Sequence, residues 1–222
     1  MKLDLISNTF KNNKGLNGGA LYLSNGINTK TSNNYNNKME KKDKITIENN
    51  VFVNNCAENF GGAIYSNYNK LYLASSLNNT ISYNTAKSMG GGIYVLNSVT
   101  TNIFDMKNWT IYNNTVNSYI DNYSSNPAYL ILDPNIPKTE LSIVSGNFLP
   151  LNFTLYDHFN KTIVDISRYY SSLELHLTLK SESEINGKMS NEKEDSTPIL
   201  IENTGAFLNG NIRRNLNRVI YL

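Results

Sequence analysis

The sequence contains little cysteine, proline, tryptophan and charge. Cys56 is the only cysteine among 222 residues, so no disulfide forms within the chain, and a disulfide-stapled scaffold is excluded. Charged residues make up 17% of the chain and the formal net charge is +2, which gives no field that would indicate nucleic acid or an anionic membrane as a partner. No apolar run approaches the length of a membrane span or of a signal peptide.

The sequence also lacks a pattern that indicates catalysis or metal binding. Both histidines, His158 and His176, lie in the last third of the chain, and the acidic residues of positions 1–132 form no close pair and recur at no fixed interval. There is no acidic loop of the calcium-binding type, and the glycine clusters lack the lysine or the helix of a phosphate loop. We therefore expect no catalytic residue, no metal site and no cofactor.

Asparagine is the residue that the chain has in excess, with 39 copies beside 15 tyrosines. Asparagine side chains compete for backbone hydrogen bonds and favour turns and caps, so this composition argues against a mostly helical protein. Hydrophobic residues make up 40% of the chain, which is enough for a core.

Two short elements recur along the first 132 residues. A glycine pair followed by an apolar residue and a tyrosine occurs three times, at residues 18–22, 61–65 and 90–94. Eight or nine residues earlier stands a second element, at residues 10–13, 52–55 and 81–84, and a fourth copy at 111–114 has no glycine pair. The last three copies are 29 to 30 residues apart, and the polar run 28–44 accounts for the longer first step as an inserted loop.

Within each period, apolar and polar residues alternate with a period of two, as in Leu3, Leu5 and Phe10. Three short strands in each 29-residue period predict an all-β chain wound as a parallel β-helix of about four coils, in which equivalent residues stack. Ordinary hairpins of an antiparallel sandwich are the alternative, although hairpins rarely repeat a unit of this length.

This architecture predicts a role for each repeated residue. The glycine pairs form corners that no Cβ could occupy: Gly18, Gly19, Gly61, Gly62, Gly90 and Gly91. The last asparagine of each second element tolerates a left-handed backbone and forms a ladder with its equivalents: Asn13, Asn55, Asn84 and Asn114. Three tyrosines stack as an outer aromatic row, which is the candidate binding surface: Tyr22, Tyr65 and Tyr94.

The Gly-Gly-Ala-Ile/Leu and Phe-x-x-Asn elements resemble the repeat of chlamydial polymorphic outer-membrane proteins, which also occurs in large surface proteins of some eukaryotes. The resemblance covers about residues 1–132. It implies a right-handed parallel β-helix of the pectin-lyase-like kind, displayed outside the cell, often adhesive and without catalysis. The fourth copy departs from the pattern, and we interpret it as the terminal coil, with residues 128–132 as its last strand.

The rest of the chain is expected to be a separate module. Residues 133–138 contain two prolines and are a predicted linker. Residues 139–222 show alternating segments such as 151–155 and 173–179, which predict a small immunoglobulin-like (Ig-like) β-sandwich with a turn at 156–162. The pattern predicts no closing strand for this sandwich, so we expect a truncated module and a chain that is a fragment of a longer, membrane-anchored protein.

Six Asn-x-Ser/Thr sequons are glycosylation candidates if the chain is exported: Asn78, Asn108, Asn113, Asn122, Asn152 and Asn160. About six are expected by chance, so they do not establish secretion.

The leading hypothesis is a non-enzymatic, surface-displayed β-helix with a structural or adhesive role, located outside the cell. Its expected partners are glycans or cell-surface proteins, with no nucleic acid and no membrane span in this chain. Two alternatives stay open. The first is a carbohydrate-active β-helix enzyme of the pectate lyase kind, and the second is the ligand-binding ectodomain of a membrane receptor.

Overall fold

The computed structural model describes residues 2–25, 44–68, 71–96, 104–132 and 151–176, together with the strands at 198–201, 204–206, 211–214 and 218–221. This part of the chain is all-β, and its only helical element is the 3₁₀ turn η1 (Leu71–Leu73). It divides into two compact units. The first comprises Met1–Ala128 with Asp157–Lys161, and the second comprises Tyr129–Tyr156 with Thr162–Leu222.

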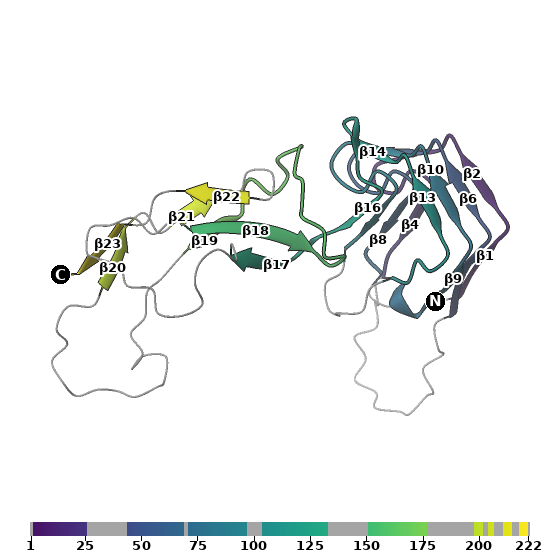
Figure 1. Cartoon of the computed structure of the whole chain (residues 1–222). Coiled ribbons are helices and arrows are strands. Elements are labelled where there is room, and N and C mark those ends of the chain that lie inside the picture. Colours follow the sequence, from purple (N-terminus) through teal and green to yellow (C-terminus); the bar gives the residue numbers. More distant parts are fainter. Residues whose placement is uncertain are drawn as a thin grey trace, which may run out of the picture. The chain divides into compact units, whose positions relative to one another are not determined.

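The first unit consists of four sheets whose neighbouring strands come from successive turns of the chain (Figure 1). Their strand orders are β1-β5-β9 (Lys2–Ile6, Lys44–Glu48, Ser75–Leu77), β2-β6-β10-β13 (Thr9–Lys11, Val51–Val53, Thr80–Ser82, Thr110–Tyr112), β3-β7-β11-β14-β15 (Lys14–Gly15, Cys56–Ala57, Thr85–Ala86, Thr115–Val116, Tyr119–Ile120) and β4-β8-β12-β16 (Leu21–Leu23, Ile64–Ser66, Ile93–Val95, Tyr123–Ser125). All pairs in these sheets are parallel except β14 with β15, which is antiparallel.

The pairing register follows the sequence repeat. Phe10 lies beside Phe52, Phe52 beside Ile81, and Ile81 beside Ile111. In the last sheet, Ile64 lies directly beside Ile93. This parallel stacking confirms the expected parallel β architecture and excludes antiparallel hairpins in these sheets. Its right-handed winding stays a prediction.

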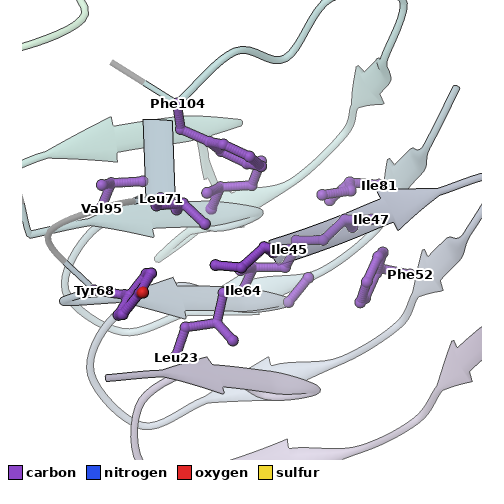
Figure 2. Packing of buried hydrophobic residues seen from close by; sticks show 12 residues of the cluster. Leu23, Ile45, Ile47, Phe52, Ile64, Tyr68, Leu71, Ile81, Val95 and Phe104 are labelled. Atoms are coloured by element: carbon purple, nitrogen blue, oxygen red, sulfur yellow. The ribbon is translucent and has the colours of Figure 1, made fainter. Parts of the chain in front are cut away.

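The core lies inside the stacked coils, where the apolar members of each alternating strand face one another. Figure 2 shows Ile45, Ile47, Phe52 and Ile64 converging from different sheets into one interior. The rings of Phe10 and Phe52 stack with their centroids 4.7 Å apart, so the same position packs on itself from coil to coil. A smaller core of three side chains is formed by strands of the third sheet: Ala57, Ala86 and Val116.

Each glycine of a pair is required for a different reason. The first glycine has a positive φ, for example +66° at Gly61, which other residues rarely adopt. The second lies against the backbone of the next coil, and a Cβ on Gly62 would stand 2.0 Å from the carbonyl oxygen of Gly91. The glycine pairs therefore set how closely the coils approach at this corner.

Two columns of turn residues have left-handed backbone conformations. One column is Asn12, Asn54, Tyr83 and Asn113, with φ values between 52° and 58°, and the other is Ser7, Asn49, Asn78 and Asn108, with φ values between 53° and 59°. Six of these eight residues are asparagine, which tolerates this conformation better than other residues with a Cβ. Much of the asparagine excess is thus a requirement of the turns.

The structure corrects the expected end of the coil stack. We expected residues 128–132 to be the last strand of the fourth coil. Instead, β16 ends the fourth sheet, and β17 (Pro127–Leu132) pairs with β18 (Leu151–Asp157) in the second unit. The step from Val116 to Tyr123 has the same length as the step from Ala86 to Ile93 in the coil before, and the hairpin of β14 and β15 lies within it.

The second unit contains short, mainly antiparallel pairs. Strand β18 pairs with β22 (Asn211–Arg214), β19 (Glu174–His176) with β21 (Thr204–Ala206), and β20 (Pro198–Ile201) with β23 (Arg218–Tyr221), each antiparallel. The strand expected at 151–155 is present within β18, and a turn follows it as expected. The predicted linker at 133–138 lies outside the described residues, and the Ig-like topology stays a prediction.

Replacing Ser7 by asparagine should stabilise the protein. Ser7 has a φ of 57° in the column whose other members are all asparagine. The substitution should raise the free energy of unfolding by about 0.5–1 kcal/mol, because a left-handed backbone costs asparagine less free energy than it costs serine. Urea unfolding checks this, with Ser7→Ala as the matched control. Equal or lower stability for Ser7→Asn than for Ser7→Ala would contradict it.

Candidate functional site

The asparagines of the second repeat element form one continuous ladder of side-chain amides. Asn13 donates to Asn55, Asn55 to Asn84, and Asn84 to Asn114, in each case through both the backbone N–H and Nδ2 to the Oδ1 of the next residue, at 2.8–3.0 Å. Asn55, Asn84 and Asn114 are fully buried. Because each amide is both donor and acceptor, the ladder satisfies its own polar groups inside the protein.

The two interior ladder amides, Asn55 and Asn84, each tie three coils together. The Nδ2 of Asn84 donates to the carbonyl oxygen of Phe52 in the coil before it, at 3.1 Å, and to Oδ1 of Asn114 in the coil after it, at 2.8 Å. A third contact, 3.0 Å to the carbonyl oxygen of Ser82, holds its own turn. Loss of the Asn84 side chain would therefore remove the acceptor of two donors of Asn55 in one neighbouring coil and one donor to Oδ1 of Asn114 in the other.

A second ladder, which the sequence reasoning missed, runs through Asn8, Asn50 and Asn79. Asn8 donates to Oδ1 of Asn50 at 2.9 and 3.2 Å, and Asn50 donates to Oδ1 of Asn79 at 2.9 and 3.0 Å. Each member stands five residues before a member of the first ladder. This recurring Asn-x-x-x-x-Asn spacing could have revealed the ladder. Trp109 replaces asparagine at the equivalent place in the next coil and so ends it.

The structure corrects one detail of the ladder. We expected the ladder asparagines to adopt the left-handed backbone themselves. The residue before each of them does so instead, as with Asn54 before Asn55 and Asn113 before Asn114. The turn and the ladder are thus separate requirements on adjacent residues, which explains the recurring Asn-Asn pair.

The three tyrosines of the glycine element stack as expected, but they do not form an exposed row. Their ring centroids are 5.1 Å apart between Tyr22 and Tyr65 and 5.9 Å apart between Tyr65 and Tyr94. Tyr22 is 52% exposed, whereas Tyr65 and Tyr94 are only 9% and 2% exposed. Phe60 packs over the row, with its centroid 4.7 Å from that of Tyr94. The row is therefore mainly structural, and only Tyr22 offers a surface for binding.

Two other tyrosines are exposed on adjacent coils. Tyr83 is 52% and Tyr112 is 40% exposed, and their rings meet edge to face with centroids 5.5 Å apart. Tyr83 occupies a left-handed turn position where other coils have asparagine. The sequence signal that could have identified the pair is this replacement of asparagine by tyrosine at a repeated position.

The last coil is closed by groups that take the place of a further coil. Asn122 Oδ1 accepts the two ladder bonds of Asn114, at 3.0 and 3.1 Å. The Asp121 carboxylate accepts from Gly90 N at 2.7 Å, whereas Gly61 N, the equivalent donor one coil earlier, bonds to the carbonyl oxygen of Met89. These polar side chains satisfy an edge that would otherwise be open to another strand.

A loop from beyond the expected linker completes this closure. Lys161 Nζ contacts Asp121 Oδ1 at 3.0 Å, donates to the carbonyl oxygen of Tyr123, and lies 4.7 Å from the centroid of the Tyr123 ring. The ring of Phe159 also contacts Tyr123, edge to face, with the two ring centroids 5.2 Å apart. We name residues 157–161 the cap loop.

Asp157 anchors the cap loop and is almost fully buried. Its Oδ1 accepts from the backbone N–H groups of Phe159 and Lys161, both at 2.9 Å, and its Oδ2 accepts from Ser125 N at 3.2 Å. Burial raises the pKa of the Asp157 carboxyl above its usual value, and these hydrogen bonds and the charge of Lys161 partly oppose the increase.

With the geometry established, a family model of the Chlamydia polymorphic membrane protein (Chlamydia_PMP) repeat matches residues 51–67. The second coil is a repeat of this type. The match begins at β6 and extends past β8, so it contains Asn55, the Gly61–Gly62 pair and Tyr65. This match confirms the resemblance seen in the sequence, and the repeat type indicates a surface protein. Comparisons with curated proteins and with solved structures gave no significant match.

The left-handed turns of the coils explain three of the six sequons. Asn78, Asn108 and Asn113 are exposed, left-handed turn residues that precede a ladder position and then a strand beginning with threonine. Asn122 is half-buried at the end of the ladder, and Asn152 and Asn160 lie in β18 and the cap loop. The turn sequence itself thus generates sequons, and their use as glycan sites stays a prediction.

The remaining polar groups of the repeat are dispersed. Glu58 pairs with Lys87 on the next coil, and both are exposed. Within the described ranges, no group of three or more His, Cys, Asp or Glu residues lies close enough to hold a metal ion. The same part of the chain contains no helix that is long and apolar enough to cross a membrane.

Position within the ladder should decide the effect of losing one amide. We expect Asn84→Ala to lower the free energy of unfolding by at least about 3 kcal/mol, because it leaves buried donors of Asn55 unsatisfied. Asn13→Ala, at the exposed start of the same ladder, should cost about 1 kcal/mol. Urea unfolding of both variants measures the difference, and equal losses would contradict the ladder's role.

The raised pKa of Asp157 predicts a pH-dependent contribution to stability. Between the ordinary carboxyl pKa of 3.8 and the higher pKa of the folded state, the folded protein binds more protons than the unfolded chain. The stability of the wild type relative to Asp157→Asn should therefore be greatest below pH 3.8 and fall as the pH rises through the folded pKa. Urea unfolding across this range measures it, with Asp4→Asn as the surface control. A relative stability that rises with pH would contradict the prediction.

Proposed function

We propose that this chain is a non-enzymatic β-helix displayed outside the cell, with a structural or adhesive role. The main support is the continuous asparagine ladder, which joins Asn13 to Asn122 through every intervening coil. A self-satisfying hydrogen-bonded column makes a rigid support whose outer face can vary without loss of the fold. The repeat of a surface-protein family in the second coil supports the location.

The finer features of the proposal follow the sequence resemblance. They are a right-handed winding of about four coils and an Ig-like module formed by residues 139–222. The parallel register of β2, β6, β10 and β13 supports the number of coils, and the antiparallel pairs of the second unit support the Ig-like module.

Adhesion requires exposed groups that can stack and hydrogen-bond, and Tyr83 with Tyr112 is the best such pair in the described coils. Tyrosine brings apolar area and a hydroxyl at low conformational cost, which suits binding to glycans or to cell-surface proteins. The two rings are already positioned against each other at 5.5 Å, so a ligand would not have to order them.

A binding screen of the whole chain against glycan arrays and cell surfaces tests the adhesive role. We expect binding that the double variant Tyr83→Ala/Tyr112→Ala weakens at least tenfold. Tyr169→Ala is the matched control, because Tyr169 is equally exposed but belongs to the second unit. Binding to no surface would contradict the adhesive role, and equal binding by the double variant would contradict the assigned surface.

The non-enzymatic part of the proposal has its own test. Incubation with polygalacturonate and related polymers should release no product. Product release that is abolished by replacing a single carboxylate would contradict the proposal and favour the carbohydrate-active alternative.

A further inference from the structure

One corner of the coil stack carries no charge. It is formed by residues 51–57, 80–86 and 110–116, which pair in register in the second and third sheets and contain no charged residue. We name this part of the first unit the uncharged corner. The charged residues that directly follow two of its segments, Glu58 and Lys87, form an ion pair with each other. The corner itself thus offers a charged ligand no group of opposite sign.

The apolar surface of the uncharged corner consists of two rings. Among its residues, all of which the structure describes, Tyr83 and Tyr112 are the only large apolar side chains that are exposed. The core of a protein–protein interface is a continuous apolar patch, which two rings do not provide. The apolar C–H face of a sugar ring is small, and one aromatic ring is enough to cover it.

Exposed amides occupy the positions before and after Tyr83 in its column of left-handed turn residues. Asn54 lies one coil before it and Asn113 one coil after it, and both are exposed. The ladder asparagines beside them are hydrogen-bonded, whereas the side-chain amides of Asn54 and Asn113 form no hydrogen bond within the described part of the chain. Each free amide offers both donors and an acceptor, as sugar hydroxyl groups do.

The spacing of the coils sets the size of the ligand. Neighbouring strands of a sheet are about 4.8 Å apart, so Asn54 and Asn113 are about 10 Å apart on either side of Tyr83. This span is wider than one sugar ring, so a ligand that reaches both amides is an oligosaccharide. Lys11 and Lys14 of the first coil also stand about 10 Å from the coil of Tyr83, two strand spacings away.

We propose that the uncharged corner binds a neutral oligosaccharide. Tyr83 and Tyr112 stack on its sugar rings, and the amides of Asn54 and Asn113 hydrogen-bond to its hydroxyl groups. An acidic sugar would place a carboxylate beside the rings with no cation in contact, and removing its water would cost free energy. The inference rests on the proposed adhesive role and names the ligand class of the same surface.

Neutral hexasaccharides are the probes: cellohexaose, mannohexaose and chitohexaose, with hexagalacturonate as the acidic counterpart. The whole chain is produced in bacteria, so that the sequon at Asn113 carries no glycan. Isothermal titration calorimetry should show saturable binding of at least one neutral hexasaccharide, at least tenfold tighter than that of hexagalacturonate. The corresponding monosaccharide should bind at least tenfold more weakly than its hexamer, because it cannot reach both amides.

Glycine substitutions test the amides with matched controls on the same coils. Asn54→Gly and Asn113→Gly keep a residue that accepts the left-handed backbone and remove the amide, so each should weaken binding at least fivefold. Asn49→Gly and Asn108→Gly are the controls, because these exposed asparagines have the same conformation in the other turn column. The controls should leave the affinity unchanged within twofold, and thermal unfolding confirms that all four variants are folded.

No binding of a neutral hexasaccharide at about 1 mM would overturn the inference. Equal binding of hexagalacturonate would also overturn it, as would an equal loss of affinity in the corner variants and their controls. Cell-surface binding that persists after glycosidase treatment would overturn the inference and leave the adhesive role standing. Binding to neither cells nor hexasaccharides would overturn both.

A neutral hexasaccharide whose binding is weakened by the corner variants, and not by their controls, would support the inference.

Discussion

The structure depends on hydrogen bonds between stacked asparagine amides. At each corner of a β-helix, one strand ends and the chain turns, so backbone polar groups of the turn become buried. Burying them costs free energy unless each donor meets an acceptor. One amide per coil solves this, because Asn84 receives two bonds from the coil before it and gives two to the coil after it. The aliphatic interior, the stacked phenylalanines and the close glycine corner are all consistent with the coil spacing that this ladder imposes.

The same constraint explains the composition. A left-handed turn residue followed by a ladder residue favours two adjacent asparagines, and five of the eight such corners in the described coils have this pair. Exceptions to the rule are therefore informative. Trp109 ends one of the two ladders. Tyr83 adopts a left-handed backbone that is unfavourable for tyrosine, and its ring lies at the surface beside Tyr112. The residues that depart from the repeat thus lie where a ladder ends or where a side chain faces the surface.

The parallel strands, their register and the family resemblance could be predicted from the sequence because equivalent residues recur every 29 to 30 positions, and a repeat that stacks on itself fixes its own contacts. Asn13, Asn55, Asn84 and Asn114 were found for this reason. The burial of Tyr65 and Tyr94 could not be predicted, because Phe60, which covers the row, stands at a position that does not recur as an aromatic: the equivalent residues are Asn17 and Met89. The closing of the last coil was missed because Asp121 and Lys161 are 40 residues apart and outside any repeat.

The position of the cap loop has a consequence for assembly during synthesis. Residues 157–161 belong to the first unit, although the chain leaves that unit at Ala128 and returns to it 29 residues later. The coils can stack in order as they leave the ribosome, but the last coil lacks its contacts with the cap loop until Lys161 has emerged. A chain that ends anywhere in the intervening segment would therefore lack the contacts of Lys161 with Asp121 and of Phe159 with Tyr123 at the last coil.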